Sequence, residues 1–147
     1  MKLKMLKILT FCVSIIFINQ SFALENKILF KINNEIISTI DLYNETKYLS
    51  LLNENLANLK KKKIYEISKN SLIREKKKEI ELLKNYKNLN INETYFDQLI
   101  NNYSKRMGFS SVKEFKESIE NNGLEVETVK KKIKIEVYWN QLIVKKF

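Results

Sequence analysis

The spacing of apolar residues changes twice along the chain and divides it into three parts. Residues 8–18 form an apolar run broken only by two hydroxyl residues, and residues 28–38 hold two short apolar stretches. From residue 38 onward, apolar positions recur at the spacings that are typical of amphipathic helices. The pattern therefore predicts an N-terminal apolar segment, a β-hairpin and a mainly helical domain.

Residues 1–23 have the order of features that defines a secretory signal peptide. Three lysines stand among the first seven residues, the apolar run follows, and small residues precede a cleavage site between Ala23 and Leu24. The run is about 11 residues long, whereas a membrane-spanning helix needs roughly 20. An uncleaved membrane anchor is the alternative, because flanking residues can lengthen a helix. We expect export, cleavage, and a mature domain at residues 24–147.

The two short apolar stretches after this segment predict a β-hairpin. They are Ile28–Ile32 and Glu35–Ser38, and the pair Asn33-Asn34 separates them. Asparagine tolerates positive φ, so this pair suits a two-residue turn of the primed type. A hairpin of this size is not stable alone, so we expect it to pack on a helix.

Two apolar stripes predict two helices between residues 38 and 83. Ser38 is expected to cap the first helix, with Asp41 placing negative charge in its first turn. Lysines 60–63 are expected to form a solvated bend or loop between the two helices. The first stripe consists of Leu42, Leu49, Leu52, Leu56 and Leu59. The second stripe consists of Ile64, Ile67, Leu72, Ile73, Ile80 and Leu83.

The third helix has the clearest start signal. Asn92 is the expected N-cap, and Ile91 and Phe96 are spaced as a hydrophobic staple. Gly108 stands where a left-handed residue ends a helix. The side of this helix that is expected to face the core carries Phe96, Leu99, Ile100, Tyr103 and Met107.

Two further helices complete the predicted domain. Ser111 and Glu114 match a capping box, and residues 121–123 are expected to end the short helix that it opens. Its inward residues are Phe115 and Ile119, and those of the last helix are Val126, Val129, Ile133, Val137 and Val144. The predicted fold class is mainly α: a small domain of about five helices with a short N-terminal β-hairpin.

Composition excludes several kinds of chemistry. The chain has no histidine, two glycines and no proline, and its one cysteine, Cys12, lies in the predicted signal peptide. Histidine is the commonest general base and metal ligand, so its absence argues against triad hydrolysis and zinc chemistry. Two glycines cannot supply a glycine-rich phosphate loop. We predict no catalytic residue, no cofactor and no metal site.

The net charge of +10, or +7 without the three lysines of residues 1–23, raises the question of a nucleic-acid partner. The lysines are interleaved with Glu, Asn and Ile, as A·T-rich codon usage produces, and export also argues against this partner. We therefore predict no nucleic-acid binding. Glu75, Glu79 and Glu81 stand beside lysines 76–78 and are interpreted as surface ion pairs. For Glu75 we also expect a structural contact with the next helix.

Several segments, taken in order, resemble the N-terminal domain of SurA-type periplasmic chaperones. The resemblance lies in residues 32–38 followed by Asp41-Leu42, in Leu72-Ile73-Arg74-Glu75, in residues 89–92 with Phe96, in residues 107–115, and in Asn122-Gly123-Leu124. Together they cover nearly the whole predicted mature chain. The stretch from Gly108 to Phe115 is one residue longer than is usual in that family.

The resemblance implies a periplasmic chaperone module with a SurA N-terminal-like helical domain at residues 24–147. Its partners would be unfolded outer-membrane proteins or aromatic-rich peptides, with transient contact to the membrane surface or the outer-membrane assembly machinery. The family's parvulin domains use histidines and glycine-rich loops, so the resemblance implies no isomerase activity in this chain. A truncated or split prolyl isomerase and a signal-anchored adaptor for one folded partner are the alternatives. A natural short form, one half of a split gene and a fragment are all compatible with the sequence.

Aromatic residues are candidates for a client-binding surface, although we expect most of them in the core. They are Tyr43, Tyr48, Tyr65, Tyr86, Tyr95, Tyr103, Tyr138 and Trp139. Trp139 lies off the stripe of the last helix, and the resemblance offers it a partner in the C-terminal segment that completes the family's domain. The sequence does not assign a binding groove.

Overall fold

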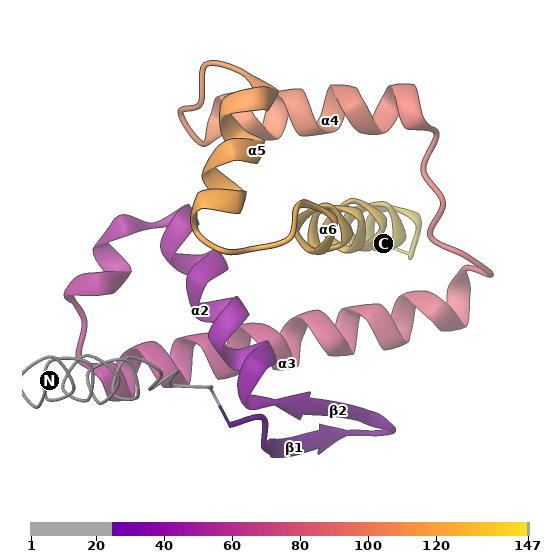
Figure 1. The fold of residues 1–147 in the computed structure, drawn as a ribbon. Coiled ribbons are helices and arrows are strands. Elements are labelled where there is room, and N and C mark those ends of the chain that lie inside the picture. The colour runs from indigo at the N-terminus through magenta and orange to yellow at the C-terminus, as the bar shows by residue number, and fades with distance from the viewer. Residues whose placement is uncertain (1–24, 147) are drawn as a thin grey trace, which may run out of the picture.

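The computed structural model describes residues 25–146 and has the predicted fold class (Figure 1). This part of the chain contains a two-stranded sheet, five α-helices and one 3-10 helix. The elements are β1 (Ile28–Ile32), β2 (Glu35–Ser38), α2 (Thr39–Leu52), η1 (Glu54–Asn58), α3 (Lys61–Asn85), α4 (Glu93–Arg106), α5 (Val112–Asn121) and α6 (Val126–Lys146). The predicted signal peptide and its cleavage site at Ala23 and Leu24 lie outside the described residues.

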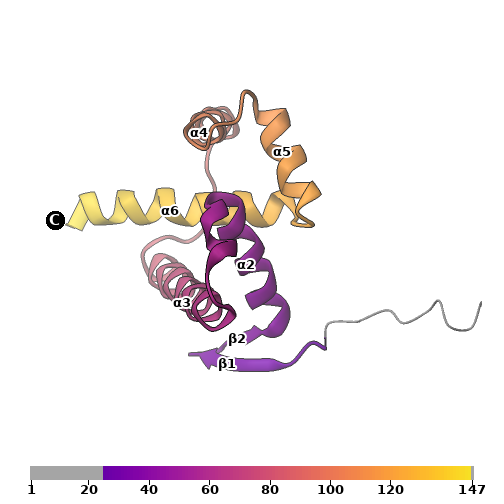
Figure 2. The ribbon, with the colours of Figure 1, turned by 90° about the vertical axis from the view of Figure 1, so that its left-hand side faces the viewer.

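Helix α6 is the central element of the domain. In Figure 1 it is seen end-on between α4 and α3, and Figure 2 shows it running across both of them. It packs on α3 and on α5, while α2 packs on α3 and α5. Within residues 25–146, every helix is too short or too polar to span a bilayer.

The predicted hairpin is present and packs on helices. Strands β1 and β2 pair antiparallel, and Asn33 takes a φ of 53° in the turn between them. Ile37 points inward and is fully buried, while Lys69 of α3 lies 5.7 Å from the centre of the Phe30 ring. The hairpin therefore closes the lower end of the pair formed by α2 and α3 (Figure 1).

Helix α2 begins at the predicted cap. The Ser38 hydroxyl accepts a hydrogen bond from the Asp41 backbone N–H at 3.3 Å, and the Asp41 carboxylate accepts one from the Ser38 N–H at 2.7 Å. These two bonds satisfy donors that a helix start otherwise leaves without partners.

The caps of the later helices also follow the prediction. Asn92 caps α4 through the Tyr95 N–H, and Ser111 caps α5 through the Glu114 N–H. The Glu114 carboxylate, however, accepts from the N–H of Ser110 at 2.8 Å rather than from that of Ser111. These caps fix the residues at which α4 and α5 begin.

The first predicted stripe and the predicted loop need correction. Asn53 interrupts the helix, so the leucines of residues 42–59 are divided between α2 and η1, and Leu52 and Leu59 remain 40% and 41% exposed. The buried residue of α2 is Glu45. The lysine run does not form a loop, because α3 already begins at Lys61.

The apolar core has two parts. The first joins α4, α5 and α6, and the second joins α3 to the C-terminal half of α6. Buried residues of the first are Phe96, Ile100, Phe115, Ile119, Leu124, Val129 and Ile133. Those of the second are Leu82, Ile135 and Leu142, with Tyr86, Leu89, Tyr138 and Trp139 packed against them.

Two residues of the predicted stripes point away from this core. Leu83 is 57% exposed and Val144 is 81% exposed, while Leu82 and Leu142 are buried instead. The inward face of α3 runs through polar as well as apolar positions because α6 presents lysines to it. A stripe defined by apolar residues alone therefore includes residues that do not lie on the buried face.

We expect Leu82→Ala to lower the free energy of unfolding by about 2–5 kcal/mol, because it leaves a cavity between α3 and α6. Leu83→Ala is the matched control, and it should cost less than about 1 kcal/mol because its side chain already contacts water. Urea denaturation followed by circular dichroism measures both. Equal losses of stability for the two variants would contradict the observation that α3 turns Leu82, and not Leu83, toward α6.

Candidate functional site

A buried lysine joins three helices at the centre of the domain. Lys132 of α6 lies between Glu45 of α2 and Glu75 of α3. Its Nζ is 2.6 Å from a carboxylate oxygen of Glu45 and also donates to Glu75. The interpretation of Glu75 as a surface ion pair is therefore wrong, and its interhelical contact is with α6 rather than with the next helix. We call these three residues the lysine clasp.

Tyrosine hydroxyls extend the lysine clasp to a fourth helix. The ring of Tyr48 lies 5.1 Å from Nζ of Lys132, and its hydroxyl is 3.0 Å from that of Tyr103 on α4. Burial and the neighbouring Tyr103 raise the pKa of Tyr48 far above its usual value. This tyrosine is therefore a neutral hydrogen-bonding group that ties α2 to α4.

The charges of the lysine clasp compensate one another in part. Burial by itself would lower the pKa of Lys132, but the carboxylates of Glu75 and Glu45 outweigh it and raise that pKa. Burial raises the pKa of Glu75, and the attraction of Lys132 opposes it only in part. One cation thus serves two carboxylates, which is an arrangement found in structural ion-pair clusters.

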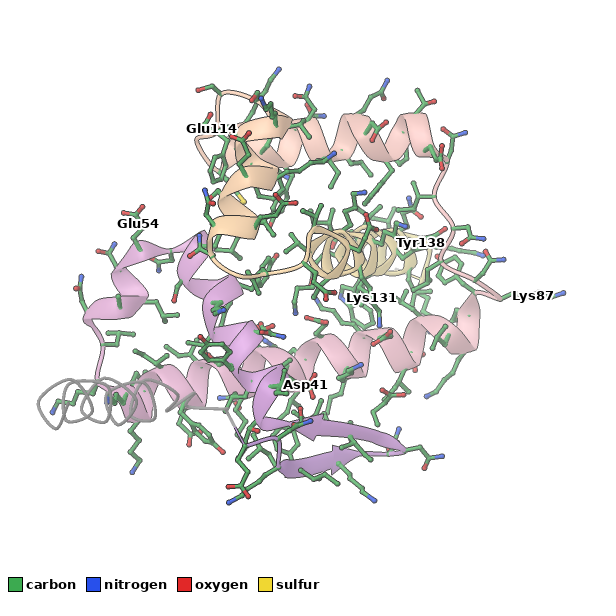
Figure 3. All side chains as sticks on the ribbon, in the orientation of Figure 1. Asp41, Glu54, Lys87, Glu114, Lys131 and Tyr138 are labelled. Atoms are coloured by element: carbon green, nitrogen blue, oxygen red, sulfur yellow. The ribbon has the colours of Figure 1, made fainter. Side chains whose placement is uncertain are left out.

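A cavity lies beside the lysine clasp. It has a volume of about 430 Å³, and most of its lining residues are polar residues of α2, α3 and α6. Lys131 faces α3 here and pairs with Glu79 at 2.5 Å (Figure 3). Lys76 pairs with the same Glu79 at 3.1 Å. No cluster of acidic residues suited to a metal ion occurs within residues 25–146.

An apolar groove lies where α2, η1 and α3 meet. Its volume is about 340 Å³, and leucines and one isoleucine provide most of its surface. The lining residues are Leu49, Leu52, Asn53, Asn55, Leu56, Leu59 and Ile67. Leu56 is buried and forms the floor, while Leu52 and Leu59 are about 40% exposed at the rim. We call it the leucine groove.

Asn53 creates the leucine groove. It ends α2 in an extended conformation, with φ −152° and ψ 99°, and its side chain accepts a hydrogen bond from the Asn55 N–H at 3.1 Å. This local bond turns the chain into η1, so Leu52 and Leu59 fall on opposite sides of a bend instead of along one helix. Sequence reasoning missed the groove because it drew one stripe through the bend, although Asn53 was the available signal.

The aromatic residues do not form one surface. The expectation that most of them belong to the core is confirmed for Tyr48, Tyr86, Tyr103, Tyr138 and Trp139, which pack against the two apolar clusters. The remaining three are exposed on three different helices, namely Tyr43, Tyr65 and Tyr95.

Trp139 belongs to the second apolar cluster. It packs there with Tyr138, whose hydroxyl donates to the Asn90 backbone carbonyl at 2.8 Å (Figure 3). Lys78 of α3 stands 5.8 Å from the centre of the Trp139 ring. The side chain therefore helps to join α3 to α6.

Comparison of the chain with protein-family models, with curated proteins and with solved structures gave no match in any of the three. The resemblance to SurA-type chaperones accordingly stays a prediction.

Replacement of the clasped lysine tests the structural role of this cluster. We expect Lys132→Met to lower the free energy of unfolding at pH 7 by about 3–5 kcal/mol, because it leaves two buried carboxylates unpaired. The deficit should shrink as the pH falls, since burial raises the pKa of Glu75 and its protonation removes one of the unpaired charges. Denaturant titrations at pH 7 and at lower pH measure both effects.

The neighbouring Lys131→Met is the matched control. Lys131 is half-exposed, and Glu79 keeps Lys76 as a partner, so the cost should be below about 1 kcal/mol. In the unaltered protein, the raised pKa of Lys132 means that its stabilisation is fully present below pH 10.5 and is lost as the pH rises further. Similar deficits for both variants at pH 7 would contradict the role of the lysine clasp.

Proposed function

We propose that this chain is a periplasmic chaperone module that holds unfolded segments of outer-membrane proteins at the leucine groove. It works without a catalytic step and without a cofactor. The compartment follows from the signal-peptide pattern of residues 1–23, and the client class follows from the resemblance to SurA-type chaperones. Transient contact with the outer-membrane assembly machinery belongs to the same proposal.

The leucine groove is the observation that supports this function. An unfolded β-barrel segment exposes alternating apolar and aromatic side chains, and a concave apolar surface takes such side chains out of water. The groove has room for side chains rather than for a folded partner, and Leu52 and Leu59 offer apolar surface at its rim. Binding through a few side chains is weak, which suits release in a compartment without ATP.

The packing of the helices supports the proposal because it does not depend on the two leucines at the rim of the groove. The lysine clasp and the two apolar clusters hold the helices together, and neither of them includes Leu52 or Leu59. Leu52 and Leu59 are about 40% exposed, and apolar surface of this kind is a cost to solubility unless it binds something. Client binding accounts for them.

The direct test uses protein that a bacterium has exported to its periplasm. Mass spectrometry should give a chain that starts at Leu24, and circular dichroism should show a helical fold. An unfolded outer-membrane β-barrel protein is then diluted from urea, and light scattering follows its aggregation. We expect suppression at near-equimolar amounts of the folded chain.

Four results would contradict the proposal. A folded chain without effect on aggregation would remove the chaperone function. Specific binding to a single folded protein would favour the adaptor, and acceleration of proline-limited refolding would favour an isomerase. Retention of residues 1–23 in the exported protein would favour the membrane anchor.

The double variant Leu52→Ser with Leu59→Ser tests the groove itself. We expect client affinity to fall about tenfold, since each serine removes apolar surface that the client would cover, for a total of about 1.4 kcal/mol. Stability should change little, because both side chains already contact water. The matched control is Leu83→Ser with Ile143→Ser, which removes similarly exposed apolar residues away from the groove. Equal losses of affinity in both pairs would contradict binding at the groove.

A further inference from the structure

Four consecutive lysines border the leucine groove. Lys60 directly follows Leu59, which lines the groove, and Lys63 stands one helical turn before Ile67, which also lines it. Residues four apart lie on the same side of a helix, so Lys63 and Ile67 share a face of α3. All four lysines are exposed. The apolar groove therefore has a positively charged border.

No carboxylate within residues 25–146 forms an ion pair with these four lysines. The interhelical ion pairs of α3 all involve its later residues, from Glu75 onward. The acidic residues nearest in sequence are Glu54 and Glu66, and neither pairs with the lysines. Glu54 projects outward from η1 (Figure 3). The positive charge at this border thus has no ion-paired carboxylate within the described part of the chain.

The start of α3 adds to the same positive potential. Lys60 caps the helix without a side-chain hydrogen bond, and the first turn contains no acidic residue. By contrast, α2, α4 and α5 each have a capping side chain and an acidic residue in the first turn. A helix N-terminus carries partial positive charge, so lysines placed there repel it and a negative group is stabilised.

We infer that the leucine groove prefers apolar segments that are flanked by aspartate or glutamate. This inference rests on the proposed chaperone function and names the client class that the same groove selects. Apolar side chains would occupy the groove, while neighbouring carboxylates lie against the lysine border and the start of α3. Charge complementarity of this kind acts mainly on the association rate and on the choice of partner.

Three labelled peptides with one shared apolar core test the preference. Their flanking residues are glutamate in the first, serine in the second and lysine in the third, and fluorescence anisotropy gives their affinities for the exported chain. At low salt we expect the glutamate peptide to bind about tenfold more tightly than the serine peptide, and the lysine peptide to bind most weakly. The differences should narrow at high salt because ions screen exposed charges.

A quadruple variant assigns the preference to the lysine border. It carries Lys60→Gln, Lys61→Gln, Lys62→Gln and Lys63→Gln, because glutamine removes the charge and has a helix propensity close to that of lysine. We expect it to bind all three peptides with the affinity that the unaltered chain has for the serine peptide. The charge-matched control replaces Lys87, Lys105, Lys113 and Lys116, which are exposed on other parts of the domain. This control should keep most of the preference.

The outcomes separate this inference from the proposed function. Equal affinities for the three peptides, or a preference that the quadruple variant keeps, would overturn the acidic-client inference and leave the chaperone function standing. Absence of binding to any peptide by a folded chain would overturn both. Lysine-dependent binding to phosphatidylglycerol vesicles without peptide discrimination would assign the border to a membrane surface and overturn the inference.

Discussion

The burial of one lysine between two carboxylates is the constraint on which the arrangement of α2, α3 and α6 depends. Removing charges from water is costly unless each finds a close partner, so Lys132 must meet Glu45 and Glu75 at once. A shift of α6 by one residue would bring Lys131 or Ile133 to the carboxylates instead. The lysine clasp therefore fixes the position of α6 more narrowly than apolar packing does, because apolar side chains tolerate exchange.

The position of the lysine clasp also determines where an apolar groove remains on the surface of the domain. The middle of α2 is held against α3 and α6, whereas its last turn continues beyond α6 into η1, on the left in Figure 1. Only Leu56 of η1 is buried there. The leucine groove thus lies at the end of α2 where the ionic contacts have stopped, so the proposed client could bind at its rim without loss of the packing that holds the helices together.

Sequence reasoning succeeded where the determinants are local. The hairpin turn at Asn33 and the caps at Ser38, Asn92 and Ser111 each depend on residues within four positions of one another. It failed for the lysine clasp, whose bonds join residues 57 and 87 positions apart and whose members are of types that usually face water. It failed at the leucine groove because the spacing of the leucines does not reveal that the helix ends at Asn53.

Lysine has two distinct roles in this chain, and the net charge does not separate them. Several lysines of the later part of α3 and of α6 meet carboxylates on the facing helix, as in the pairs Lys78–Glu136 and Lys131–Glu79. Residues 60–63 meet none among the described residues and gather at a helix start, where positive charge is unfavourable. Codon bias, our interpretation of the abundance of lysine, does not explain this difference. The paired lysines join helices, and the unpaired run leaves positive charge beside an apolar groove, which is the combination that an acidic, apolar client complements.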